Sequence, residues 1–119
     1  MHILIVQENE HLGRLWANHL EREGHATHLV HSQEQAITAL QTRESRVIVL
    51  DVMLRHGSAF AISDFASYRW PDARVVFVTS STFFSDGSIF QHAQNACAYL
   101  KSDTDPEDLA KMVTYYAAT

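Results

Sequence analysis

Short apolar runs and amphipathic segments alternate along the whole chain. Apolar runs that read as strands are followed by segments with helical spacing, which is the pattern of a parallel sheet covered by helices. The expected strands cover residues 2–6, 25–30, 47–50, 74–79 and 96–100. The second of these is the most polar, so we expect it near an edge of the sheet.

Apolar residues three and four apart mark the segments between the strands as helices. These helices are expected over 10–23, 32–40, 60–68 and 82–93, followed by a last helix that begins at Asp105-Pro106. Gly24 ends the first helix, and Ser32 with Gln35 resembles a capping box at the second. In the last helix we expect Leu109, Met112, Val113 and Tyr116 to face inward. The five units predict an α/β fold, a doubly wound five-stranded parallel sheet in a (βα)5 flavodoxin-like three-layer sandwich.

Composition narrows the class of protein. The chain has 119 residues, 46% of them hydrophobic, which suits one domain over 1–119. Its one cysteine, Cys97, allows neither an internal disulfide nor a cysteine-based zinc site. The apolar run at residues 2–6 is too short for a signal peptide or a membrane helix, so we expect a soluble cytoplasmic protein.

Charge argues against nucleic acid as a partner. The net charge is −5, and the nine Lys and Arg residues are scattered rather than clustered, so we expect no direct binding to DNA. The eight histidines are expected at the surface rather than in a metal site. His25 and His28, for example, are three apart in an expected strand and therefore point to opposite faces.

Polar residues follow four of the expected strands at their carboxyl ends, where sheets of this class bind ligands. They are Gln7, Glu8, Asn9 and Glu10, then Asp51, then Thr79, Ser80 and Ser81, and finally Lys101, Ser102 and Asp103. Carboxylates, a hydroxyl and a cation together suit a divalent metal ion and a phosphoryl group. Any one of these residues alone has a plainer interpretation, because strand ends need turns and helix caps.

Four segments resemble the receiver domains of two-component response regulators. ILIVQENEHLGRLWANHLEREGH is similar to their opening, ILIVDDE followed by a helix that ends in Leu-x-x-x-Gly, and VIVLDVMLRHGSAF to their DxxLPDGxGF stretch. VVFVTSS resembles their fourth strand, and NACAYLKSDTDPEDL resembles GADDYLxKPFxPEEL. The segments occur in the family's order along the whole chain.

The resemblance implies a role for five residues. Asp51 corresponds to the phosphoacceptor, Glu8 to a carboxylate that binds Mg²⁺, and the Met53 backbone carbonyl to a further metal ligand. Thr79 corresponds to the hydroxyl that bonds the phosphoryl group, and Tyr99 to the aromatic residue that rotates on activation. The implied reaction is Mg²⁺-dependent phosphoryl transfer from a histidine kinase or phosphotransfer protein to Asp51, so the chain would not be an enzyme in the ordinary sense.

Several positions depart from the family pattern. Gln7 replaces the first of two acids and Glu8 is longer than the usual Asp, so Mg²⁺ binding is expected to be weaker, with Gln7 contributing through its carbonyl or a water. The family's lysine falls on Ser102, and Lys101 is expected to face away unless the strand end is kinked. Asp103 stands where the family has a proline, typically cis.

The loop after Asp51 departs too. Arg55 and Ala59 replace the family's Pro and Gly. Arg55 or His56 could supply the positive charge of the missing lysine, a hypothesis that rests on proximity in the loop alone.

Three functions are compatible with the sequence. A phosphorylatable receiver is favoured by Asp51 and Thr79, and a degenerate receiver that binds proteins independently of phosphorylation is favoured by Gln7 and Ser102. A flavin-binding enzyme of the same architecture is disfavoured, because the acidic stretch QENEHLG would repel phosphate. In either receiver reading an effector or a second copy would bind the face formed by the fourth helix, fifth strand and last helix. Its aromatic residues are Phe83, Phe84, Phe90, Tyr115 and Tyr116.

Overall fold

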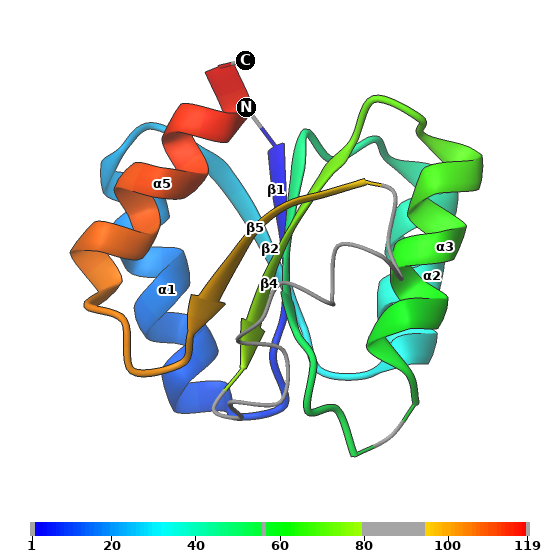
Figure 1. The fold of residues 1–119 in the computed structure, drawn as a ribbon, viewed down its shortest axis with the longest axis horizontal. Coiled ribbons are helices and arrows are strands. Elements are labelled where there is room, and N and C mark those ends of the chain that lie inside the picture. The colour runs from blue at the N-terminus through cyan, green and yellow to red at the C-terminus, as the bar shows by residue number, and fades with distance from the viewer. Residues whose placement is uncertain (1, 56, 80–94, 119) are drawn as a thin grey trace.

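A computed structural model describes residues 2–55, 57–79 and 95–118 of the chain. Its centre is a five-stranded parallel sheet in the order β2-β1-β3-β4-β5 (Figure 1). The strands are β1 (His2–Val6), β2 (Ala26–Val30), β3 (Val47–Asp51), β4 (Arg74–Thr79) and β5 (Ala96–Lys101). The described helices are α1 (Glu10–Arg22), α2 (Gln33–Thr42), α3 (Ala59–Arg69) and α5 (Pro106–Ala118).

The predicted doubly wound fold is confirmed. Helices α1 and α5 cover one face of the sheet, while α2 and α3 cover the other (Figure 1). Strand β2 lies at an edge, as its polarity predicted, and only its last residue is buried. The helix expected over 82–93 lies outside the described residues. Of the helices that are described, none combines the length and apolar character needed to cross a membrane.

The central strands are buried because they carry apolar side chains on both faces. Alternate residues of each strand enter two cores, one under α1 and α5 and one under α2 and α3. The first contains Ile3, Ile5, Trp16, Leu20, Val49 and Val113, and the second contains Leu4, Val6, Leu40, Leu50, Ile62 and Phe77.

One prediction about the buried face of α5 is wrong. Met112 is exposed, whereas the buried stripe of the helix consists of Leu109, Ala110, Val113 and Ala117. Met112 follows Leu109 by three residues, which turns it about 60° away from the side of the helix on which Ala110, Val113 and Ala117 lie. Tyr116 is half-buried against the core beneath α1 and α5, in agreement with the sequence pattern.

Side-chain caps begin three of the described helices. Asn9, Ser32 and Ser58 each accept a hydrogen bond from the backbone N–H three residues ahead. Such a cap typically stabilises a helix by about 1 kcal/mol. The expected capping box is only half formed, because Gln35 Oε1 accepts from the N–H of His31 rather than from that of Ser32.

Strand β5 contains one residue more than its neighbour at its start. Val75 pairs with Ala96 but Val76 pairs with Ala98, so Cys97 forms a bulge. Downstream the pairing is regular, with Tyr99 beside Phe77 and Lys101 beside Thr79.

Candidate functional site

The candidate site lies where β1, β3 and β4 end at the same edge of the sheet. Asp51 is the last residue of the central strand β3 and is half-buried. Gln7 follows β1 and is 3% exposed, and Thr79 ends β4 and is fully buried. The strand order therefore brings together three residues that are far apart in the sequence.

Both carboxylate oxygens of Asp51 accept hydrogen bonds from the protein. Gln7 Nε2 donates to Oδ2 at 2.7 Å, and the backbone N–H of Met53 donates to Oδ1 at 2.8 Å. Bonds to an ionised group are shorter and stronger than neutral ones, and each contributes about 1.5–3 kcal/mol. The protein itself thus stabilises the Asp51 carboxylate.

A second contact fixes the orientation of the Gln7 amide. Its Oε1 accepts a 3.0 Å hydrogen bond from the backbone N–H of Asn9. Turning the amide over would place its NH₂ group against that N–H and its oxygen against the Asp51 carboxylate, two unfavourable pairs. The hydrogen-bond pattern therefore directs a donor, not an oxygen ligand, at Asp51.

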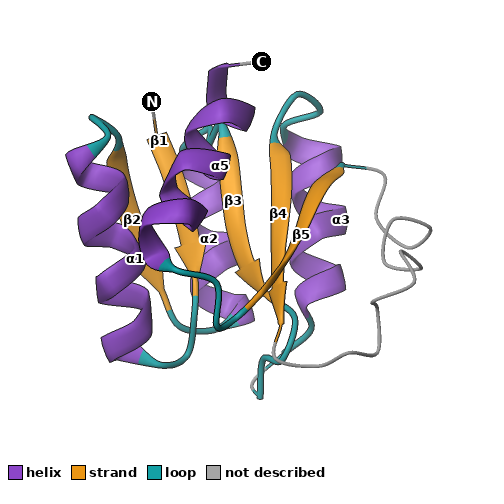
Figure 2. Ribbon diagram, turned by 60° about the vertical axis from the view of Figure 1, so that its left-hand side comes forward, coloured by secondary structure: helices purple, strands orange, loops and turns teal. Residues whose placement is uncertain are grey.

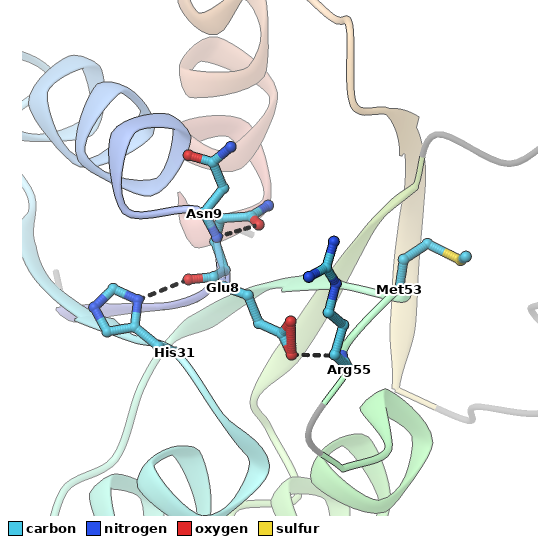
Figure 3. A pocket seen from close by; sticks show the side chains of 6 residues that line it. Glu8, Asn9, His31, Met53 and Arg55 are labelled. Atoms are coloured by element: carbon cyan, nitrogen blue, oxygen red, sulfur yellow. Dashed lines mark hydrogen bonds between the residues drawn. The ribbon is translucent and has the colours of Figure 1, made fainter.

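His31 is a member of this site that the sequence reasoning missed. Its Nδ1 lies 2.9 Å from the backbone oxygen of Gln7, and its Nε2 lies 2.7 Å from Oε2 of Glu10. The imidazole ring thereby joins the end of β2 to the loop after β1 (Figure 3). A signal was present, because His31 directly follows an expected strand, as the other candidates do.

Glu8 binds the loop that follows β3. Its Oε1 accepts a hydrogen bond from the backbone N–H of Arg55 (Figure 3). A hollow of about 520 Å³ opens between these groups, lined by Gln7, Glu8, Asn9, His31, Met53 and Arg55. Arg55, which the sequence placed near the site, does line it, whereas His56 lies outside the described residues.

The same loop is also held from α2. Gln33 Oε1 accepts a 2.8 Å hydrogen bond from the N–H of Ser58. Gly57 adopts φ +119°, and a Cβ there would come within 2.3 Å of the Gln33 side chain. Three acceptors, from Glu8, Gln33 and Asp51, therefore bind backbone N–H groups of this loop, at Arg55, Ser58 and Met53 respectively.

On the β5 side of the site, the strand register places Lys101 beside Thr79. The N–H of Ser102 donates to the carbonyl of Thr79 at 2.9 Å, which extends the pairing of β4 with β5. The Lys101 side chain is exposed, and it does not line the hollow beside Glu8. Tyr99 is half-buried against the core that contains Phe77.

These residues fit a hard divalent cation poorly. Mg²⁺ requires near-octahedral oxygen ligands at about 2.0–2.1 Å. Gln7 presents an N–H at Asp51, and Glu8 Oε1 already accepts from Arg55. Within the ranges 2–55, 57–79 and 95–118, no group of three or more His, Cys, Asp or Glu side chains is placed to hold a metal ion.

Comparison with known proteins identifies the fold. Neither a protein-family model nor a curated protein matches the sequence. Among solved structures, a CheY-like response regulator receiver domain protein from Methanospirillum hungatei JF-1 superposes with a TM-score of 0.88 at 18% identity, covering 98% of this chain and 93% of that one. The chain has the receiver fold of response regulators.

Two further receiver-fold structures contain ligands of their own. A response regulator from Burkholderia pseudomallei, with a phosphorylated aspartic acid, calcium ion and citrate, gives a TM-score of 0.83 at 21% identity over 98% of this chain and 68% of that one. The response regulator TrrA from Thermotoga maritima, in complex with Mg²⁺ and BeF, gives 0.81 at 16% identity over 97% of both chains. At such identities the receiver fold is shared, and the ligands belong to those proteins.

Proposed function

We propose that this chain is a signalling domain with the receiver fold that acts by binding other proteins, and that it does so without Mg²⁺-dependent phosphorylation of Asp51. The observation that carries the proposal is the hydrogen bond from Gln7 Nε2 to Asp51 Oδ2. Where the family pattern has a second acid, this chain has an amide that supplies a donor to the carboxylate. Two N–H donors of the protein, from Gln7 and Met53, therefore stabilise the Asp51 charge.

A cation at Asp51 would compete with contacts that the carboxylate already makes. A metal ion that took Oδ2 of Asp51 as a ligand would compete with a charge-assisted hydrogen bond that contributes about 1.5–3 kcal/mol. The Gln7 amide offers no negative charge in return, and charge count is a main determinant of affinity for hard cations. Ser102 also supplies no ammonium where the family pattern has a lysine.

A second candidate function is the phosphorylatable receiver. It is supported by the position of Asp51 at the end of the central strand, with the buried Thr79 ending the strand beside it. A histidine kinase or phosphotransfer protein would then donate the phosphoryl group, and Gln7 would have to release Asp51. The Lys101 ammonium or the Arg55 guanidinium would have to supply positive charge.

In both candidates the partner would be an effector or a second copy. The expected binding face includes β5, α5 and the helix predicted over 82–93, which lies outside the described residues together with Phe83, Phe84 and Phe90. Tyr115 on α5 is 65% exposed, and its ring meets that of Tyr116 edge to face at 5.2 Å. Exposed aromatic side chains are common in protein interfaces.

The two candidates differ in their response to a phosphoryl mimic. Amide NMR spectra would be recorded with millimolar Mg²⁺ and beryllofluoride for the natural chain, Gln7→Asp and Asp51→Asn. We expect no shifts around Asp51 and Thr79 in the natural chain and clear shifts in Gln7→Asp, which regains the second acid. Shifts in the natural chain that vanish in Asp51→Asn would overturn the proposal in favour of the phosphorylatable receiver.

A further inference from the structure

A groove of about 710 Å³ runs between the edge strand β2 and helix α2, on the side of the molecule away from β5. Three consecutive residues at the end of the strand, His28, Leu29 and Val30, line one wall, and His31 and Ser32 continue it. The other wall is lined from the helix by Glu34, Gln35, Thr38, Ala39 and Thr42. Consecutive strand residues point to opposite faces, so a wall made of all of them is the edge of the strand and not one of its faces. Figure 2 shows β2 at the left-hand edge of the sheet.

The hydrogen bonds of β2 indicate which backbone groups face this groove. The carbonyl of Val30 accepts from the N–H of Gln7, so Val30 points toward β1. In a parallel strand the backbone groups of alternate residues point to opposite neighbours. Thr27 and Leu29 therefore direct their N–H and C=O groups outward, and in the described part of the chain no strand pairs with this edge.

The position after the strand supports this assignment. The N–H of His31 belongs to the same outward set, and Gln35 Oε1 accepts from it at 2.8 Å. This contact closes the outer edge at its carboxyl end, which leaves Thr27 and Leu29 as the open positions.

The edge lacks the features by which proteins prevent strand addition. Proteins usually protect edge strands with Lys, Pro, inward charges or bulges. The sequence of β2 is ATHLV, and its register with β1 is uninterrupted over all five pairs. The groove beside it has a helix as its other wall. An exposed sheet edge is the kind of surface to which an extended peptide can add as a further strand.

We propose that an extended segment of a partner protein binds here as an added strand beside β2, with its main chain paired to Thr27 and Leu29 and alternate side chains directed at α2. This inference does not depend on the chemistry of Asp51. The helix wall offers Thr38, Ala39 and Thr42, which suits small or β-branched side chains.

Charge favours such a segment over a second copy. Glu34 is the one formal charge of the lining apart from its two histidines, so a basic residue near the carboxyl end of β2 complements it. A second copy would carry the same net charge of −5, and repulsion between two chains of like net charge disfavours self-association.

The test uses a display library of random heptapeptides against the whole chain, followed by affinity measurements on synthetic versions of the selected peptides. Pairing along a strand edge uses the backbone groups of every second peptide residue. N-methylation of those paired amides should therefore weaken binding about tenfold or more, whereas N-methylation of the amides between them should have little effect on binding. Thr38→Trp fills the groove from an exposed helix position and should abolish binding. Gln41→Trp, on the same helix but outside this groove, should not.

Three outcomes would overturn the inference. The library could yield no binder, the N-methyl series could show no alternation, or Gln41→Trp could weaken binding as much as Thr38→Trp does. Sedimentation of the chain alone tests whether a second copy of the chain occupies the groove. A dimer that dissociates when Thr38 is replaced by Trp would assign the groove to that second copy. Thr42→Trp repeats the test from one turn further along the helix if Thr38→Trp fails to fold.

Discussion

Gln7 Nε2 donates a 2.7 Å hydrogen bond to Oδ2 of Asp51, although 44 residues separate the two in the sequence. The pairing of β1 with β3 explains how they meet. Val6 lies beside Leu50 in the register of these parallel strands, and Gln7 and Asp51 are the next residues of each. The sheet therefore sets the amide beside the carboxylate, and the contact forms with the fold itself.

Removing this amide should destabilise the protein. We expect Gln7→Ala to lower the free energy of unfolding by about 1.5–3 kcal/mol, because half-buried Asp51 loses a charge-assisted donor. Urea unfolding measures the change. A double-mutant cycle with Asp51→Ala separates this contact from the Asn9 contact that Gln7→Ala also removes. A coupling energy below about 0.5 kcal/mol would show that the bond contributes little.

Substitution of Gly57 should be more costly than substitution of Gly24. Both glycines have positive φ, +119° and +92°, so alanine is strained at either position. At Gly57 the new Cβ would also meet the Gln33 side chain, whereas nothing lies within 4 Å at Gly24. We expect about 1–3 kcal/mol of destabilisation for Gly24→Ala and more for Gly57→Ala in thermal or urea unfolding. Equal losses would refute the close approach to Gln33.

Stability should fall on acidification through the histidines at the amino-terminal end of the sheet. Burial lowers the pKa of His2 below its usual 6.5, helped by Arg43 and His28, and burial also lowers the pKa of His25. A group whose pKa is lower in the folded state takes up its proton more readily when unfolded. Its contribution is therefore complete above pH 6.5 and is lost as the pH falls below that value.

Two measurements check this pH dependence. The titration of each imidazole, followed by NMR, should give a midpoint below 6.5 for His2 and His25. The loss of stability between neutral and mildly acidic pH should be smaller in His2→Gln, which cannot take up the proton. An unchanged slope in that variant would remove His2 from the explanation.

Cys97 should react slowly with alkylating reagents. Burial raises the pKa of its thiol from 9.0 to about 11, so at pH 8 the reactive thiolate is about 100-fold less populated than in a free thiol. Mass spectrometry of iodoacetamide labelling, with and without urea, gives the two rates. Labelling of the native chain as fast as that of the unfolded one would contradict this picture of the thiol.

The strands could be predicted from the sequence because strands that are buried on both faces consist of uninterrupted apolar runs. The end of such a run also placed Asp51 at the carboxyl edge of the sheet, and the greater polarity of β2 gave its edge position. Each of these inferences uses only the side chains of one segment. The roles assigned to Glu8, Met53, Thr79, Lys101, Ser102 and Tyr99 by resemblance remain predictions.

The contacts of the site depend on pairings that no single segment encodes. The bond from Gln7 to Asp51 requires the register of β1 with β3, and the role of His31 requires β2 to lie beside β1. Gln33 could not be placed near Gly57 without knowing how α2 meets the loop after β3. The hydrophobic pattern of each segment was enough to predict the fold, whereas the contacts of the site also depend on the order and register of the strands.

The bulge at Cys97 affects how β5 would tolerate the loss of a residue. Two residues of β5 occupy the space of one residue of β4 at the bulge. Beyond it, Tyr99 lies on the same face as Phe77, and the later residues alternate regularly between the faces. Deletion of the Cys97 codon would remove the bulge and leave Tyr99 beside Phe77, because Ala96 and Ala98 already pair with the consecutive residues Val75 and Val76. A deletion after Ala98 would instead turn the following side chains to the opposite face, so we expect the start of β5 to tolerate the loss of one residue that its middle does not.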